Sequence, residues 1–247
     1  MNNYEKLEGM VAATFTPLDE NGDVNLSVID KYADWIASTP IKGVFVCGTT
    51  GEFSSLTIDE RKLILEKWLV SARKRFKVIA HVGSNCQRSA MELARHAAQV
   101  GADAIASIAP SFFKPGTVDE LVDFFAPICH SAAGLPFYYY NMPSITGVNL
   151  PVDKFLVEGK KKIPNLVGTK FTHNNLMEMG VCIELEQHRF EVLHGYDEIL
   201  ISGLAMGAVA GVGSTYNYIP NVYQAIFDSM KMNDLETARH NQIKSIR

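Results

Sequence analysis

The sequence predicts a single α/β domain folded as a (β/α)8 barrel, and three observations support this prediction. Eight short apolar runs rich in β-branched and aromatic residues recur along the 247 residues, with helical patterns between them. Parallel strands buried on both faces read as such runs and need helical crossovers. Eight units in about 250 residues match this barrel, and no Gly-rich dinucleotide fingerprint follows the first run.

Each element has its own sequence signal. The predicted strands span residues 10–15, 43–48, 77–83, 103–110, 136–141, 166–171, 190–195 and 208–213. Thr57 is a predicted N-cap for a helix over 58–73, Gly101 ends a helix over 88–100, and Thr117 precedes one over 118–132. Two more helical patterns, 220–230 and 234–247, follow the last strand. No linker or repeat divides residues 1–247, so one domain is expected.

Composition excludes several classes of function. The chain is 47% hydrophobic and 20% charged, as in an ordinary globular protein. Its net charge of -4 provides no basic field, so nucleic acid is not expected as a partner. The N-terminal segment lacks a signal-peptide pattern, and no segment has the roughly 18 apolar residues of a membrane span. We therefore expect a cytoplasmic protein with no membrane partner.

Lys170 is the first candidate catalytic residue, because it interrupts the apolar run LVGTKF. In a (β/α)8 barrel the active site lies at the carboxyl ends of the strands. Strand alternation places Lys170 on the same face as Gly168 and Thr172. If that face is the barrel interior, desolvation favours a neutral, nucleophilic amine that can form a Schiff base with a ketone. The alternative is a lysine whose stem packs on a helix while its ammonium reaches water.

Tyr140 is the second candidate catalytic residue, since it ends the run FYYY in the strand before that of Lys170. Neighbouring strands lie about 4.8 Å apart, so its phenol could approach the amine and transfer protons. The alternative is a structural tyrosine with a satisfied hydroxyl.

Two polar clusters are candidate binding sites. Residues 48–52 (GTTGE) follow the second strand, and their backbone N–H groups and threonine hydroxyls suit a carboxylate. An ordinary connecting loop is the alternative there. Asp197 and Glu198 follow the seventh strand, and Ser214 follows the eighth. Paired carboxylates can accept hydrogen bonds from a polyol, or they simply stabilise the N-terminus of the next helix.

Several ordered motifs together resemble one family. GTTGE, YNMPSITG, GTKFT, GYDE and GVGSTYN occur in this order along the chain. They resemble the N-acetylneuraminate lyases of the dihydrodipicolinate synthase superfamily, from about Gly9 onward. The resemblance implies a (β/α)8 barrel, a Schiff-base aldolase acting on a sialic acid, no metal or organic cofactor, and a homotetramer. The family usually continues into further C-terminal helices, so the resemblance implies a shortened C-terminal extension here.

The resemblance also implies residue roles. Lys170 would form the Schiff base, Tyr140 would handle protons, and Thr49 and Thr50 would hold the carboxylate of the keto acid. The residues implied to contact the sugar portion are Thr172, Gly195, Asp197, Glu198 and Ser214.

Two positions distinguish this chain within the superfamily. Dihydrodipicolinate synthases place an arginine five residues after the strand-five tyrosine, whereas this chain has Ile145, which cannot pair with a second carboxylate. Bacterial relatives carry a relay tyrosine after strand four, where this chain has Phe112 and Phe113. We therefore expect a relay through Tyr140 and water. Another pyruvate-dependent sugar-acid aldolase and a catalytically silent ligand-binding barrel remain the alternatives.

Overall fold

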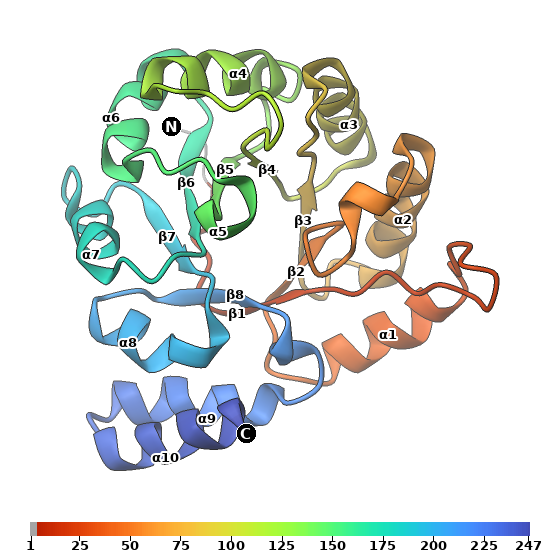
Figure 1. Ribbon diagram of the computed structural model, residues 1–247. Coiled ribbons are helices and arrows are strands. Elements are labelled where there is room, and N and C mark those ends of the chain that lie inside the picture. The colour runs from red at the N-terminus through yellow and green to blue at the C-terminus, as the bar shows by residue number, and fades with distance from the viewer. Residues whose placement is uncertain (1–3) are drawn as a thin grey trace.

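The eight predicted strands form a closed parallel barrel in the order β1 to β8, which confirms the predicted (β/α)8 fold (Figure 1). The computed structural model describes residues 4–247. The strands are β1 (Gly9–Ala13), β2 (Gly43–Val46), β3 (Lys77–His81), β4 (Ala104–Ile108), β5 (Phe137–Asn141), β6 (Leu166–Phe171), β7 (Glu191–His194) and β8 (Ala210–Gly213). Every strand falls within one predicted run or extends it by a single residue.

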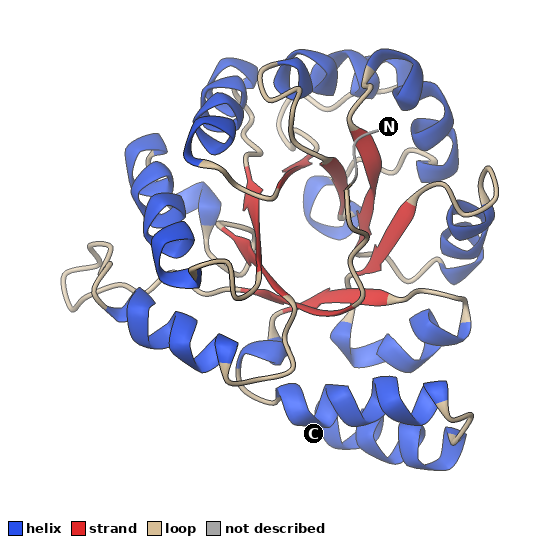
Figure 2. Ribbon diagram, turned by 180° about the vertical axis from the view of Figure 1, so that it is seen from behind, coloured by secondary structure: helices blue, strands red, loops and turns tan. Residues whose placement is uncertain are grey.

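Helices surround the barrel as an outer layer (Figure 2). They are α1 (Val28–Ala37), α2 (Ile58–Ala72), α3 (Gln87–Val100), α4 (Val118–His130), α5 (Pro143–Thr146), α6 (Val152–Lys162), α7 (Leu176–Glu184), α8 (Leu200–Ala205), α9 (Pro220–Lys231) and α10 (Leu235–Ile246). Short 3-10 turns are η1 (Phe53–Ser55), η2 (Asp197–Ile199) and η3 (Thr215–Asn217). Across residues 4–247, no helix has the length and apolarity needed to cross a bilayer.

The predicted helix signals act where the sequence places them. Thr57 Oγ1 accepts a hydrogen bond from Glu60 N at 3.3 Å, and the Glu60 carboxylate accepts one from Thr57 N at 2.7 Å. This reciprocal pair of hydrogen bonds is a capping box. It provides acceptors for backbone N–H groups that have no partner within the first turn of the helix. Gly101 ends α3 with φ +83°, a left-handed conformation that glycine adopts without steric cost.

Side chains of the barrel strands alternate between its interior and the helical layer. In β5, Tyr138 and Tyr140 lie inside the barrel, whereas Tyr139 points outward and packs on Phe125 and Phe155. This alternation follows the two-residue period of a strand. Tyr140 is paired in register with Lys170 on β6. Paired residues on neighbouring strands face the same side of the sheet, so both side chains point into the barrel.

Candidate active site

Lys170 lies inside the barrel near the carboxyl end of β6, with only 4% of its surface exposed. Its Nζ is 4.5 Å from the ring centroid of Phe45 and 4.0 Å from that of Tyr140, and both rings belong to the barrel interior. Among residues 4–247, no carboxylate lies within ion-pairing distance of this amine. The side chain therefore does not pack outward against a helix, and its amine is available to a ligand in the barrel.

Tyr140 presents its ring face, rather than its hydroxyl, to the amine of Lys170. The hydroxyl is hydrogen-bonded to Thr49 Oγ1 at 3.1 Å and also donates to Met142 Sδ at 3.1 Å. The structure thus brings three predicted site residues together: the amine, the phenol and the first threonine of the loop after β2. A phenol in this position can exchange a proton with a ligand bound at the amine.

The loop after β2 has a tightly constrained backbone. Cys47 and Glu52, at its two ends, have φ values of +54° and +56°, in the left-handed region. A Cβ at Gly48 would lie 2.8 Å from the Phe45 ring, so only glycine fits there. Thr49 and Thr50 are both half-buried. Thr49 reaches Tyr140, whereas the Thr50 hydroxyl makes no hydrogen bond to the other candidate residues.

Thr172 and Gly195 adjoin one another at the ends of β6 and β7. Thr172 is 4% exposed, and its Oγ1 has no hydrogen-bond partner within the described part of the chain. A Cβ at residue 195 would lie 1.9 Å from this oxygen, so Gly195 is required for Thr172 to keep its position. A buried hydroxyl without a partner is costly, and a ligand hydroxyl could satisfy it.

Asp197 is a buried carboxylate on η2 with one oxygen free. Its Oδ2 accepts hydrogen bonds from Thr215 N at 2.9 Å and Thr215 Oγ1 at 2.6 Å, whereas Oδ1 has no partner in residues 4–247. Burial raises the pKa of Asp197, and the hydrogen bonds from Thr215 and the charge of Lys170 oppose that rise. The carboxylate packs over Gly213, where a Cβ would lie 1.8 Å from Oδ1.

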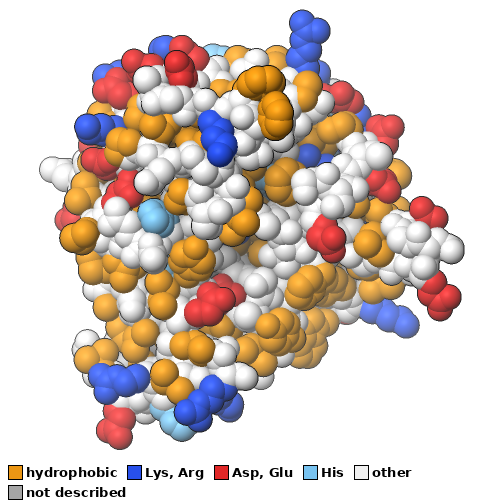
Figure 3. Space-filling model, viewed as in Figure 1, with side chains coloured by type: hydrophobic (Ala, Val, Ile, Leu, Met, Phe, Trp, Pro, Cys, Tyr) orange, Lys and Arg blue, Asp and Glu red, His pale blue; other side chains and the backbone are white. Residues whose placement is uncertain are grey.

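Glu198 and Ser214 are less enclosed than Asp197. Glu198 is exposed and Ser214 is half-buried, and no side-chain hydrogen bond joins either to the other candidate residues. The face of the molecule over the barrel centre is hollowed, with acidic side chains nearby (Figure 3). The candidate site therefore has a closely connected inner part around Lys170 and Tyr140 and a more open acidic edge.

Comparison with known proteins agrees with this geometry. The model of the dihydrodipicolinate synthetase family matches residues 6–246. The chain belongs to the dihydrodipicolinate synthetase family. This confirms the superfamily suggested by the sequence motifs.

Similar proteins within this family carry a common name. The chain is 44% identical over 245 residues to N-acetylneuraminate lyase of Gallus gallus, covering 98% of this chain and 80% of that protein. The structure of Proteus mirabilis N-acetylneuraminate lyase superposes with a TM-score of 0.96 at 36% identity, covering 98% of this chain and 82% of that one. A catalytic lysine mutant of Ruminococcus gnavus sialic acid aldolase superposes with a TM-score of 0.93 at 28% identity, covering 98% of this chain and 79% of that one.

The positions at which the sequence analysis expected a departure from relatives, Phe112, Phe113 and Ile145, follow β4 and β5 at the carboxyl end of the barrel. Phe112 and Phe113, after β4, are 76% and 86% exposed. Neither side chain can replace a phenol in proton transfer. Ile145 in α5 is 59% exposed and offers no cation to a carboxylate.

His81 is an interior polar residue that the sequence analysis did not single out. Its ring packs on Tyr140 with centroids 5.8 Å apart, and Nδ1 lies 2.8 Å from the carbonyl oxygen of Cys47. Nε2 accepts from Ile108 N at 3.3 Å, so the ring proton resides on Nδ1 and is donated to Cys47. Burial lowers the pKa of His81 well below its usual range, which keeps the ring neutral. The signal was a polar residue in the apolar run KVIAHVG, the same signal that identified Lys170.

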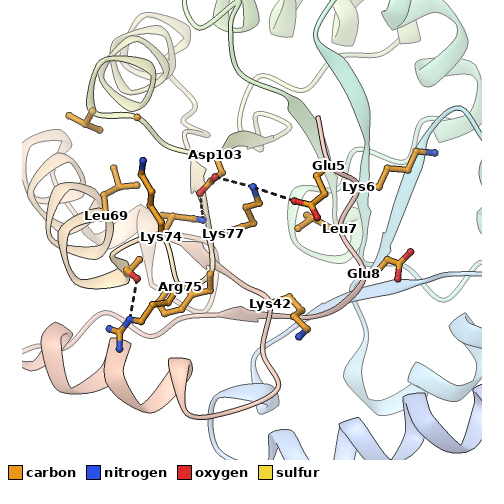
Figure 4. A pocket seen from close by; sticks show the side chains of 15 residues that line it. Glu5, Lys6, Leu7, Glu8, Lys42, Leu69, Lys74, Arg75, Lys77 and Asp103 are labelled. Atoms are coloured by element: carbon orange, nitrogen blue, oxygen red, sulfur yellow. Dashed lines mark hydrogen bonds and ion pairs between the residues drawn. The ribbon is translucent and has the colours of Figure 1, made fainter. Parts of the chain in front are cut away.

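A large cavity lies at the opposite end of the barrel, and none of the predicted site residues line it (Figure 4). Its volume is about 1130 Å³, and charged side chains near the amino ends of the strands line it. Lys77 there forms ion pairs with Asp103 at 3.5 Å and Glu5 at 3.9 Å. Because the amino-terminal face of such barrels serves stability rather than chemistry, we assign the active site to the other end. No cluster of metal-ligating residues occurs between residues 4 and 247.

Proposed function

We propose that the chain is a class I aldolase that reversibly cleaves N-acetylneuraminate into pyruvate and N-acetylmannosamine. The observation that carries this proposal is the buried amine of Lys170, enclosed by two aromatic rings and without a carboxylate partner among the described residues. The names of the similar proteins support the substrate, and the catalytic lysine of the Ruminococcus gnavus sialic acid aldolase supports an amine mechanism.

In the proposed reaction, the Lys170 amine adds to the C2 ketone of the open-chain sugar acid, and water leaves to form a protonated imine. The imine accepts the electron pair of the C3–C4 bond as that bond breaks. The C4 hydroxyl loses its proton and becomes the aldehyde of N-acetylmannosamine. The enamine that remains is protonated at C3, and hydrolysis releases pyruvate and free Lys170. The imine itself is the electron sink, so the mechanism requires no metal or organic cofactor.

Other predicted residues have complementary roles in this proposal. Tyr140 transfers protons through water, since its hydroxyl is directed to the loop of Thr49 and its ring to the amine. Thr49 and Thr50 bind the carboxylate of the keto acid. The sugar hydroxyls are bound by Thr172, Gly195, Asp197, Glu198 and Ser214. The free oxygens of Thr172 and Asp197 support this assignment, because each lacks a hydrogen-bond partner within residues 4–247.

Trapping with pyruvate and borohydride tests the amine mechanism directly. The unaltered protein should gain one reduced pyruvate adduct, which peptide mass spectrometry should locate on Lys170. Lys170→Met should gain none, whereas Lys162→Met, at an exposed lysine paired with Asp123, should label normally. An unlabelled parent protein, or a Lys170→Met variant that still labels, would contradict the proposal and favour a silent binding barrel.

Comparison of substrates tests the sugar assignment separately. We expect cleavage of N-acetylneuraminate to exceed that of 2-keto-3-deoxy sugar acids in kcat/KM. The opposite preference would retain the amine mechanism but identify another pyruvate-dependent sugar-acid aldolase.

The assembly is inferred from the family resemblance, and the location from the N-terminal segment, which has no signal-peptide pattern. We propose a homotetramer in the cytoplasm. Light scattering should give four times the mass of the chain, and a monomeric mass would refute the tetramer.

A further inference from the structure

Gln242 connects the last helix of the chain to the turn that carries Asp197. Gln242 lies on α10 and is 4% exposed. Its Nε2 donates a hydrogen bond to the Asp197 carbonyl oxygen at 2.9 Å, and its Oε1 accepts one from Ile201 N at 2.9 Å. One side-chain amide thus holds both ends of a five-residue segment that begins at Asp197 and enters α8.

Hydrogen bonds occupy both N–H donors and the oxygen of the Gln242 side-chain amide. The second N–H of Nε2 donates to Ser245 Oγ at 2.9 Å, one turn along the same helix. A buried amide costs free energy unless its donors and acceptor are paired. The pairing therefore restricts Gln242 to one orientation, and the backbone of η2 is restricted with it.

A second connection reaches the same carboxylate from α9. Tyr223 is fully buried, and its hydroxyl is hydrogen-bonded to Thr215 Oγ1 at 2.7 Å. Thr215 in turn donates to Asp197 Oδ2. Helix α9 thus orients one carboxylate oxygen through Thr215, while α10 holds the backbone of the same residue through Gln242. The helices α9 and α10 lie side by side below α8 (Figure 1).

We propose that Gln242 is a positioning residue for the sugar-binding turn. It fixes the backbone of Asp197 so that the free Oδ1 is directed to the hydroxyls of the sugar portion. This inference rests on the proposed function, in which Asp197 binds that portion. Gln242 has no role in forming the imine, because its hydrogen bonds all lie at η2, α8 and α10. Its loss should therefore weaken sugar binding and leave the reaction of Lys170 with pyruvate intact.

The test compares Gln242→Met with Gln224→Met, the same substitution on α9. Among residues 4–247, the Gln224 side chain bonds only to Asp228 on its own helix, at 2.8 Å. Gln242→Met should raise KM for N-acetylneuraminate about tenfold, as expected when a binding group is displaced. Pyruvate–borohydride labelling of Lys170 should stay at the parent level in both variants, and Gln224→Met should keep the parent KM.

A second variant covers the case in which Gln242→Met does not fold. Gln242→Glu has nearly the same shape and retains an acceptor for Ile201 N, but at neutral pH it cannot donate to the Asp197 carbonyl. Gln242→Glu should also raise KM for N-acetylneuraminate, and pyruvate–borohydride labelling of Lys170 should stay at the parent level. A folded variant with parent KM, or one whose labelling falls as much as its cleavage, would overturn the positioning role. A parent protein that does not label with pyruvate would instead overturn the proposed function, and this inference with it.

Discussion

Lys170 and Tyr140 lie in contact on two neighbouring strands of the candidate site. The ring of Tyr140 lies against the amine, while its hydroxyl points to Thr49. In the proposed reaction, this single side chain both encloses the amine with its ring and provides a proton donor to the ligand with its hydroxyl. These two functions reside in different atoms, so a substitution can separate them.

Tyr140→Phe should retain the ring contact and lose only the hydroxyl. We expect pyruvate labelling of Lys170 to persist while turnover falls about 100-fold or more, in the range typical of lost general acid–base catalysis. Steady-state kinetics combined with the borohydride assay would measure both effects. Parent turnover in this variant would exclude the phenol from the proton relay.

Asp197 and Glu198 are adjacent in sequence but differ in burial, and both are proposed to bind the sugar. Replacement by Asn and Gln, respectively, should raise KM for N-acetylneuraminate, since hydrogen bonds to a charged group contribute about 1.5–3 kcal/mol. The effect should be larger at the buried Asp197. If these residues only stabilised a helix end, KM would stay constant and stability would change slightly, as urea unfolding of each variant would reveal.

At the scale of elements, local caps determine where helices begin and end. Thr57→Ala would remove the side-chain half of the capping box that Thr57 and Glu60 form at α2. We expect a loss of about 1 kcal/mol in the free energy of unfolding. The parent KM should be unchanged, because the hydrogen bonds of the cap involve no candidate site residue. An unchanged unfolding midpoint would show that the cap is dispensable.

Contacts between elements hold the residue at the proposed sugar-binding edge. The carboxylate of Asp197 is held by Thr215 after β8, and its backbone is held by Gln242 on α10. Neither contact is local in sequence. The edge of the site thus depends on helices that lie outside the barrel itself.

For the whole molecule, burial of His194 couples stability to pH. His194 is fully buried on β7, and burial lowers its pKa to about 4 from the usual 6.5. The unfolded chain therefore binds a proton that the folded chain excludes between these values. Stability from this group is fully present above about pH 6.5 and is lost as pH falls toward 4, by about 3 kcal/mol.

The raised pKa values of Asp197 and Glu191 act in the opposite direction, so the contribution of His194 must be isolated. His194→Leu should lose less stability than the parent on acidification from pH 6.5 to 4. Urea unfolding of parent and variant across this range would measure the two slopes. Equal slopes would show that His194 does not account for the acid sensitivity.

Local signals in the sequence are enough to predict the barrel. Two-sided burial makes each parallel strand an apolar run, and the strand period of two places Lys170 inside once its partner Tyr140 is inside. The caps at Thr57 and Gly101 form hydrogen bonds with residues nearby in the sequence, so they can be predicted from local patterns. The family could also be predicted from the sequence, because several motifs in a fixed order identify it more specifically than any one motif does.

The assembly of the candidate site depends on long-range contacts, which sequence patterns do not reveal. The pairing of β5 with β6 shifts register between Phe137 and Tyr138, which sets Tyr140 opposite Lys170. Barrel closure then determines that the Tyr140 ring faces the amine, that Asp197 is buried beside exposed Glu198, and that Gln242 reaches η2. These outcomes depend on contacts between residues far apart in the chain. Local periodicity and helix caps do not predict which distant residues come into contact.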